Sequence, residues 1–290
     1  MARAPYSFAA GVEALARAAA PLQPQRLAMT ILGAHGRGGR TVWSGGLVEA
    51  LLEFGFSPGA GRVALGRLVR RGLLERSREG RLIHYRLTEA GERLMREGDR
   101  RIFSFGRASG GDDVWTVVWH TIPEEQGLAR SWLARRLRFL GFGSLQDGTW
   151  VAPHDMAEAL GALLDDTGLA EHSIVLVGRP AKPPDLEALV RRAWNLEDVA
   201  RRYQAFAAAA SSLSGPPASD LQAFMGRTLV THLFRQFPSD DPELPDDPLG
   251  LHPLRERALG LFDELFARLE APAQRHFDSV TRSPSARAAA

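Results

Sequence analysis

Arginine is concentrated in one part of the chain. Residues 60–107 hold thirteen arginines and six acidic residues, an excess of seven positive charges, although the 290-residue chain has a formal charge of only +2. A guanidinium group is a planar donor that suits phosphate oxygens and the O6/N7 edge of guanine. A basic block in an otherwise balanced chain is typical of a protein that binds a polyanion. We therefore expect this segment to bind nucleic acid.

These arginines fall on a predicted helix. Ser57 is a favourable N-cap, Pro58 suits the first helical position, and Gly72 marks the end of the helix. Apolar residues at helical spacing predict a stripe that packs against the core, formed by Val63, Leu65, Leu68 and Val69. Arg62, Arg67 and Arg70 fall outside this stripe, so we expect them to face solvent or a ligand.

A basic β-hairpin is predicted to follow the helix, with strands at 73–76 and 82–87 around a glycine-containing turn. This order is typical of a winged helix-turn-helix, in which the helix enters the major groove and the wing contacts the backbone or the minor groove. The residues predicted to bind DNA are Arg62, Arg67 and Arg70 of the helix and Arg76, Arg78 and Arg81 of the wing. The alternative is a helix–hairpin unit whose arginines only face water, because runs of charge are usually solvated.

Three glycines, Gly59, Gly61 and Gly66, lie within the arginine-bearing helix. Each costs about 1 kcal/mol relative to alanine in a helix interior. Either the first turn is frayed, or the small residues let the backbone approach DNA closely. The sequence leaves both explanations open.

The chain is long enough for two or three domains, and we expect an α+β protein. Residues 25–105 are predicted to form the winged helix domain, with helices at 25–34 and 44–54, a strand at 41–43 that pairs with the wing, and a linking helix at 88–103.

Residues 112–180 are predicted to form a ferredoxin-like middle domain with the element order βαββαβ. Residues 185–275 read as a helical C-terminal domain. The ends are expected to be less ordered: a flexible arm at 1–24, with a short helix near 12–20, and a disordered tail at 276–290.

Several classes of site are absent from the sequence. The chain has no cysteine, which excludes disulfides, thiolate metal sites and a cysteine nucleophile. The eight histidines show no HxxxH or HExxH spacing, and no GxSxG motif is present. No apolar run approaches the roughly 20 residues that span a membrane. We expect a cytoplasmic protein that is not an enzyme and has no cofactor or metal.

Motifs in three regions, taken together, resemble the PaaX-type transcriptional repressors of phenylacetate catabolism. The resemblance runs from Arg26 to Leu269. Its motifs are, in order, Gly72-Leu73-Leu74, Gly80-Arg81, Tyr85-Arg86-Leu87-Thr88, Trp115-Thr116, Leu140-Gly141-Phe142-Gly143, Gly148-Thr149-Trp150-Val151-Ala152-Pro153, His232-x-x-Arg235 and Asp241-Pro242-Glu243-Leu244-Pro245. The resemblance implies a winged helix, a middle domain like the CRISPR-associated Cas2 proteins and a helical C-terminal domain. It also implies a homodimeric repressor of double-stranded operator DNA, released by an aryl-acyl-CoA such as phenylacetyl-CoA.

An effector of this class needs cations for its phosphates and an apolar slot for its acyl group. The candidates for the slot are Phe142, Trp150, Trp194 and Tyr203, and those for the polar end are Arg179, Arg201, Arg202, His232 and Arg235. The alternative is structural: the aromatic residues belong to the core, and His232 and Arg235 hold a helix to the acidic loop through Asp241.

Two other functions are compatible with the sequence. Cas2-like sandwiches include metal-dependent nucleases with an acidic residue at the end of the first strand, but that strand ends here at His120, and Asp112 and Asp113 precede it. Convergent carboxylates, which metal-assisted cleavage requires, are not evident. The second alternative is a DNA-binding protein without a ligand, which would not need a large helical C-terminal domain.

Overall fold

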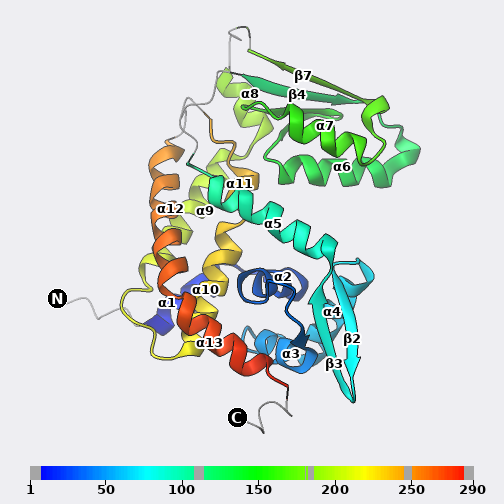
Figure 1. The fold of residues 1–290 in the computed structure, drawn as a ribbon. Helices are drawn as coiled ribbons and strands as arrows, with labels where there is room; N and C mark the ends of the chain where they lie inside the picture. The colour runs from blue at the N-terminus through cyan, green and yellow to red at the C-terminus, as the bar shows by residue number, and fades with distance from the viewer. Residues whose placement is uncertain (1–7, 108–113, 180, 182–185, 245–249, 284–290) are drawn as a thin grey trace, which may run out of the picture. The chain divides into compact units, whose positions relative to one another are not determined.

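The computed structural model describes residues 8–107, 114–179, 181, 186–244 and 250–283 (Figure 1). Contacts divide the chain into two compact units, each assembled from segments that are distant in the sequence. Unit 1 comprises Met1–Arg101, Ala205–Phe234 and Arg257–Ala290, and unit 2 comprises Ile102–Gln204 and Arg235–Glu256.

The N-terminal part of unit 1 contains the elements predicted around the arginine-bearing helix. They are α2 (Pro24–His35), β1 (Val42–Trp43), α3 (Ser44–Leu52), α4 (Pro58–Arg70), β2 (Leu74–Glu79), β3 (Leu82–Leu87) and α5 (Glu89–Ser104). The three strands form an antiparallel sheet in the order β1-β3-β2. The predicted pairing of the strand at 41–43 with the hairpin is therefore confirmed.

Helix α4 starts with a complete N-cap, because the Ser57 side chain accepts a hydrogen bond from the Ala60 amide at 3.2 Å. This geometry argues against a frayed first turn. The helix buries Ala64, Leu65 and Leu68. The expectation that Val63 packs in the core is wrong: its side chain is 52% exposed, since Ala64 occupies the inward position.

The expectation of a flexible arm at 1–24 is wrong over α1 (Phe8–Ala18), while residues 1–7 lie outside the described residues. Phe8, Val12 and Leu15 are spaced along one face of this helix and are buried. They pack against α10 (Asp220–Phe234). A partner 200 residues away in the sequence therefore orders this segment.

The expected disordered tail at 276–290 is wrong up to residue 281, while residues 284–290 lie outside the described part of the chain. Helix α13 (Glu270–Thr281) packs against α3 and α10, and Phe277 is fully buried. The contact is close, because a Cβ added at Gly46 would lie 2.2 Å from the carbonyl oxygen of Val280.

Arg227 of α10 ties the C-terminal helices of unit 1 to the N-terminal ones. Its buried guanidinium donates to the carbonyl oxygens of Ala34 and Phe266 at 2.9 and 3.1 Å and lies 4.0 Å from the centre of the Phe266 ring. The residues predicted as a separate helical domain, 185–275, are thus divided between the two compact units. Helix pairing across the chain, which local periodicity does not encode, produces this division.

Unit 2 contains the predicted βαββαβ order, which is confirmed. Its elements are β4 (Trp115–His120), α6 (Gly127–Phe139), β5 (Gly143–Gln146), β6 (Thr149–Ala152), α7 (Ala157–Asp165) and β7 (Ser173–Gly178). Neighbouring strands are antiparallel in the order β5-β6-β4-β7. Helices α6 and α7 cover one face of the sheet, and Val118, Leu133 and Leu160 lie in the core between them (Figure 1).

The rest of unit 2 is helical. It comprises α8 (Leu186–Ala193), α11 (Phe237–Asp240), the first half of α9 (Leu196–Ser211) and the start of α12 (Leu251–Arg268). Its centre is the buried carboxylate of Asp241, which accepts two hydrogen bonds of 2.8 Å from Arg255 and one of 2.7 Å from the Tyr203 hydroxyl. In the described part of the chain, no helix combines the length and the apolar character needed to cross a bilayer.

Candidate functional site

The exposed face of α4 carries three of the arginines predicted to bind DNA. Gly61, Ala64, Leu65 and Leu68 face the core, and Arg62, Arg67 and Arg70 lie on the other side, exposed. At 3.6 residues per turn, the middle of the exposed face is formed by Gly59, Val63, Gly66 and Arg70. Arg62 and Arg67 lie on its two flanks.

The β2–β3 hairpin carries the other three arginines. Arg76 and Arg78 lie on β2, and Arg81 follows Gly80, which turns the chain with a φ of +59°. All three are exposed, and Arg78 donates to the carbonyl oxygen of Gly80 at 2.8 Å. Helix α4 packs against β2, so helix and hairpin are neighbours within unit 1.

These six arginines keep their positive charge uncompensated. None of them forms an ion pair with a residue of the described ranges. By contrast, Arg40, Arg86 and Arg275 of the same unit pair with acidic side chains, namely Asp278, Glu75 and Asp220. The structure therefore places all six predicted residues on two adjacent elements as unpaired cations.

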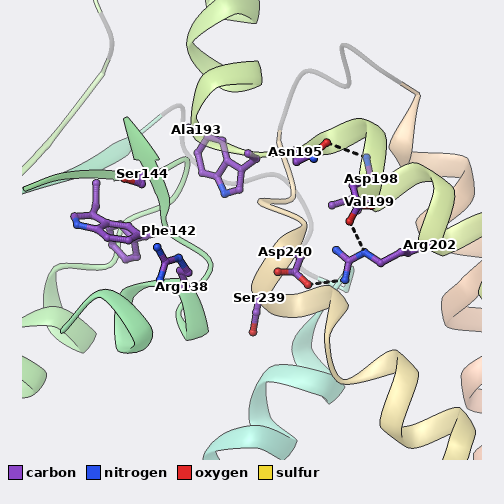
Figure 2. Close-up of a pocket in the computed structure, with 12 residues that line it drawn as sticks. Arg138, Phe142, Ser144, Ala193, Asn195, Asp198, Val199, Arg202, Ser239 and Asp240 are labelled. Carbon is purple, nitrogen blue, oxygen red and sulfur yellow. Dashed lines mark hydrogen bonds and ion pairs between the residues drawn. The ribbon is translucent and has the colours of Figure 1, made fainter. Parts of the chain in front are cut away.

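A second concave site lies in unit 2 and has a volume of about 210 Å³ (Figure 2). It lies among α6, the β5–β6 hairpin, the α8–α9 junction and α11. Its lining consists of Arg138, Phe142, Ser144, Trp150, Ala193, Trp194, Asn195, Asp198, Val199, Arg202, Ser239 and Asp240.

The two cations of this pocket differ in their surroundings. Arg202 is neutralised by Asp198 at 3.0 Å and Asp240 at 2.8 Å (Figure 2). Arg138 lies with its guanidinium 5.1 Å from the centre of the Trp150 ring and pairs with no acid of the described residues. The pocket thus combines aromatic rings with one uncompensated cation, which suits an anionic aromatic group.

Four of the residues predicted to bind an effector line this pocket: Phe142, Trp150, Trp194 and Arg202. The others do not. Arg179 follows β7, Arg201 is exposed beside Asp198, Arg235 lies outside the lining, and Tyr203 is fully buried beneath Asp241.

His232 belongs to unit 1, where it is buried and hydrogen-bonded to Thr30 at 3.0 Å. The predicted contact of His232 and Arg235 with Asp241 is also corrected: the printed partners of this carboxylate are Arg255 and Tyr203. Burial uses these polar groups in the core.

Arg138 and the Asp198–Asp240 pair were not predicted from sequence as part of a site. Arg138 is one of several arginines on α6, and only its place in the last turn distinguishes it. Asn195 could have been found, because its side chain caps α9 by accepting from the Asp198 amide at 3.1 Å, the spacing typical of an N-cap.

The acidic residues considered for a nuclease do not form a metal site in the described structure. Asp112 and Asp113 lie outside the described residues. Within the described ranges, no group of three or more His, Asp or Glu side chains could hold a metal ion.

Three family models match the chain in consecutive order. They are described as PaaX-like protein (residues 23–91), PaaX protein central Cas2-like domain (109–190) and PaaX-like protein C-terminal domain (194–279). The chain is also 29% identical over 255 residues to the transcriptional repressor PaaX of Escherichia coli (strain K12), covering 84% of this chain and 78% of that protein. Among solved structures, the uncharacterized protein Rv0674 from Mycobacterium tuberculosis matches with a TM-score of 0.49 and 20% identity, covering 88% of this chain and 96% of that one.

These matches and the observed elements define a mixed α+β protein with a Cas2-like central domain. The chain belongs to the PaaX family.

Proposed function

We propose that the protein is a DNA-binding transcriptional repressor. The observation that carries the proposal is the set of six exposed, unpaired arginines on α4 and the β2–β3 hairpin. The similarity to a protein named as a transcriptional repressor supports it. Helices α2–α4 with the β1-β3-β2 sheet act as a winged helix-turn-helix in which α4 enters the major groove.

The positions of the arginines on α4 suggest different roles for them. Arg70 lies on the midline of the exposed face and reads a base edge, for which guanine O6/N7 is the usual partner. Arg62 and Arg67 lie on the flanks and bind phosphates on the two walls of the groove. Arg76, Arg78 and Arg81 bind the backbone or the minor groove from the hairpin.

The resemblance to the family extends the proposal to regulation. The protein represses an operon for phenylacetate-type aromatic acids as a homodimer on a palindromic operator, and an aryl-acyl-CoA releases it. We assign the acyl end of this effector to the pocket of unit 2, between Trp150, Trp194 and Arg138. The volume of about 210 Å³ lies below the roughly 300–1,000 Å³ of a drug-sized site, so the nucleotide part of the CoA stays outside it.

DNA binding is tested with the promoter between this gene and its neighbours, first by footprinting and then by fluorescence anisotropy over a range of salt concentrations. Arg67→Ala should weaken binding, reduce the salt slope by about one unit, and leave the melting temperature unchanged. Arg257→Ala is the matched control, because Arg257 is an exposed arginine of α12 in the same unit. Unchanged affinity of Arg67→Ala would remove that residue from the interface.

The effector is tested separately by calorimetry with phenylacetyl-CoA on the full chain. We expect heat of binding, release of the footprint, and loss of both in Arg138→Gln. If the ligand gives no heat and does not release the DNA, this effector is excluded while the DNA-binding proposal stands.

A further inference from the structure

Strand β7 forms one edge of the four-stranded sheet. It pairs only with β4, so the outward backbone groups of β7 have no strand partner among the described residues. Natural edge strands are usually protected by charged residues, proline or a bulge. Strand β7 has none of these: its sequence, SIVLVG, is uncharged, and its register with β4 is continuous from Ser173 to Gly178.

An apolar patch adjoins this edge. Trp119, Ile174, Leu176 and Val177 are four of the nine large apolar side chains exposed in the described part of the chain. Trp119 is the cross-strand neighbour of Ile174, and Leu176 follows two residues later on the same face. This face is opposite to the one that Val118 and Val175 turn toward the core under α6 and α7.

We propose that β7 pairs with β7 of a second copy of this chain, antiparallel and about a twofold axis at Val175. The two sheets then form one continuous sheet. In this register Ile174 lies opposite Leu176 of the partner subunit, and Leu176 opposite the partner's Ile174, so the exposed apolar side chains of each copy are covered by those of the other.

Charge selects both the occupant and the register. Glu171 and Arg179 are exposed and lie four residues before and four residues after Val175. Antiparallel pairing about Val175 therefore sets Glu171 opposite Arg179 of the partner subunit at both ends of the interface. A shift of two residues removes this match, and a parallel arrangement places like charges side by side. Such self-complementarity is what a twofold interface between identical chains requires.

The first test is sedimentation equilibrium of the full chain without DNA. The native protein should be a dimer, and Leu176→Lys should raise its dissociation constant on the order of 100-fold, because symmetry introduces the buried charge twice. Leu128→Lys is the control, since Leu128 is 90% exposed on α6 of the same unit and should leave the dimer intact. Both side chains face solvent in one copy, so thermal melts should show both variants folded. A native protein that is monomeric at about 100 μM, or a dimer that tolerates Leu176→Lys, overturns the proposal.

The second test addresses the register. Glu171→Arg and Arg179→Glu should each weaken dimerisation about tenfold, and the double variant should restore it because the opposite charges face each other again. Two weakening effects that add without rescue would overturn the pairing about Val175. Because no DNA is present, these results are independent of the proposal that the protein is a repressor.

Discussion

Gly66 lies at the centre of the exposed face of α4, and nothing in the described structure requires a glycine there. Its backbone is helical, without a positive φ, and a Cβ built on it would find only the Arg70 Nη1 atom, at 4.0 Å. Gly61 differs, since its added Cβ would contact Leu51 and Val48 at 3.5–3.6 Å. We infer that Gly66 is glycine because a bound DNA groove must approach the α4 backbone closely.

Gly66→Ala should therefore change stability and DNA binding in opposite directions. Alanine is favoured over glycine in a helix interior by about 1 kcal/mol. This gain should raise the melting temperature by about 2–4 °C. The added methyl group stands between Val63 and Arg70 on the face that we assign to DNA, and it should lower operator affinity about tenfold, equivalent to 1.4 kcal/mol.

The assays are a thermal melt and an anisotropy titration with the operator. Gly260→Ala is the matched control, because a Cβ at this glycine of α12 meets no atom within 4 Å. It should stabilise the protein similarly and leave DNA binding unchanged. If Gly66→Ala is more stable and binds DNA as tightly as the native protein, the inference of close approach is refuted; if it is less stable, the packing argument is refuted.

Two further predictions concern buried polar groups. Asp241→Asn leaves the Arg255 guanidinium without its counter-ion and should lower the free energy of unfolding by about 3 kcal/mol or more in urea denaturation; a loss below 1 kcal/mol would show that the ion pair contributes little. Burial lowers the pKa of His35 from 6.5 to about 3, so the unfolded chain binds more protons below pH 6.5, and the stabilisation is complete above that pH and falls as the pH decreases toward 3. The free energy of unfolding should be about 2 kcal/mol lower at pH 5 than at pH 7 from this group. His35→Gln should remove that part of the difference, and an identical pH profile in the variant would contradict the assignment.

The elements that carry the proposed DNA interface were predictable because their signals are local. Ser57 and Pro58 define the start of α4, its apolar spacing defines the buried side, and Gly80 permits the tight turn of the hairpin. Arginines outside the apolar stripe then had to face outward. The βαββαβ order of unit 2 follows likewise from alternating runs of strand and helix pattern.

The sequence by itself thus determined the family, the strand and helix order, and the exposed arginines of α4 and the hairpin. Only the tertiary structure decided that α1 and α13 are ordered, that Tyr203 and His232 are held in the core, and that Arg138 lies beside Trp150. These outcomes depend on contacts between segments tens to hundreds of residues apart. Local propensity and periodicity specify which face of an element is apolar, but not which distant element will cover it.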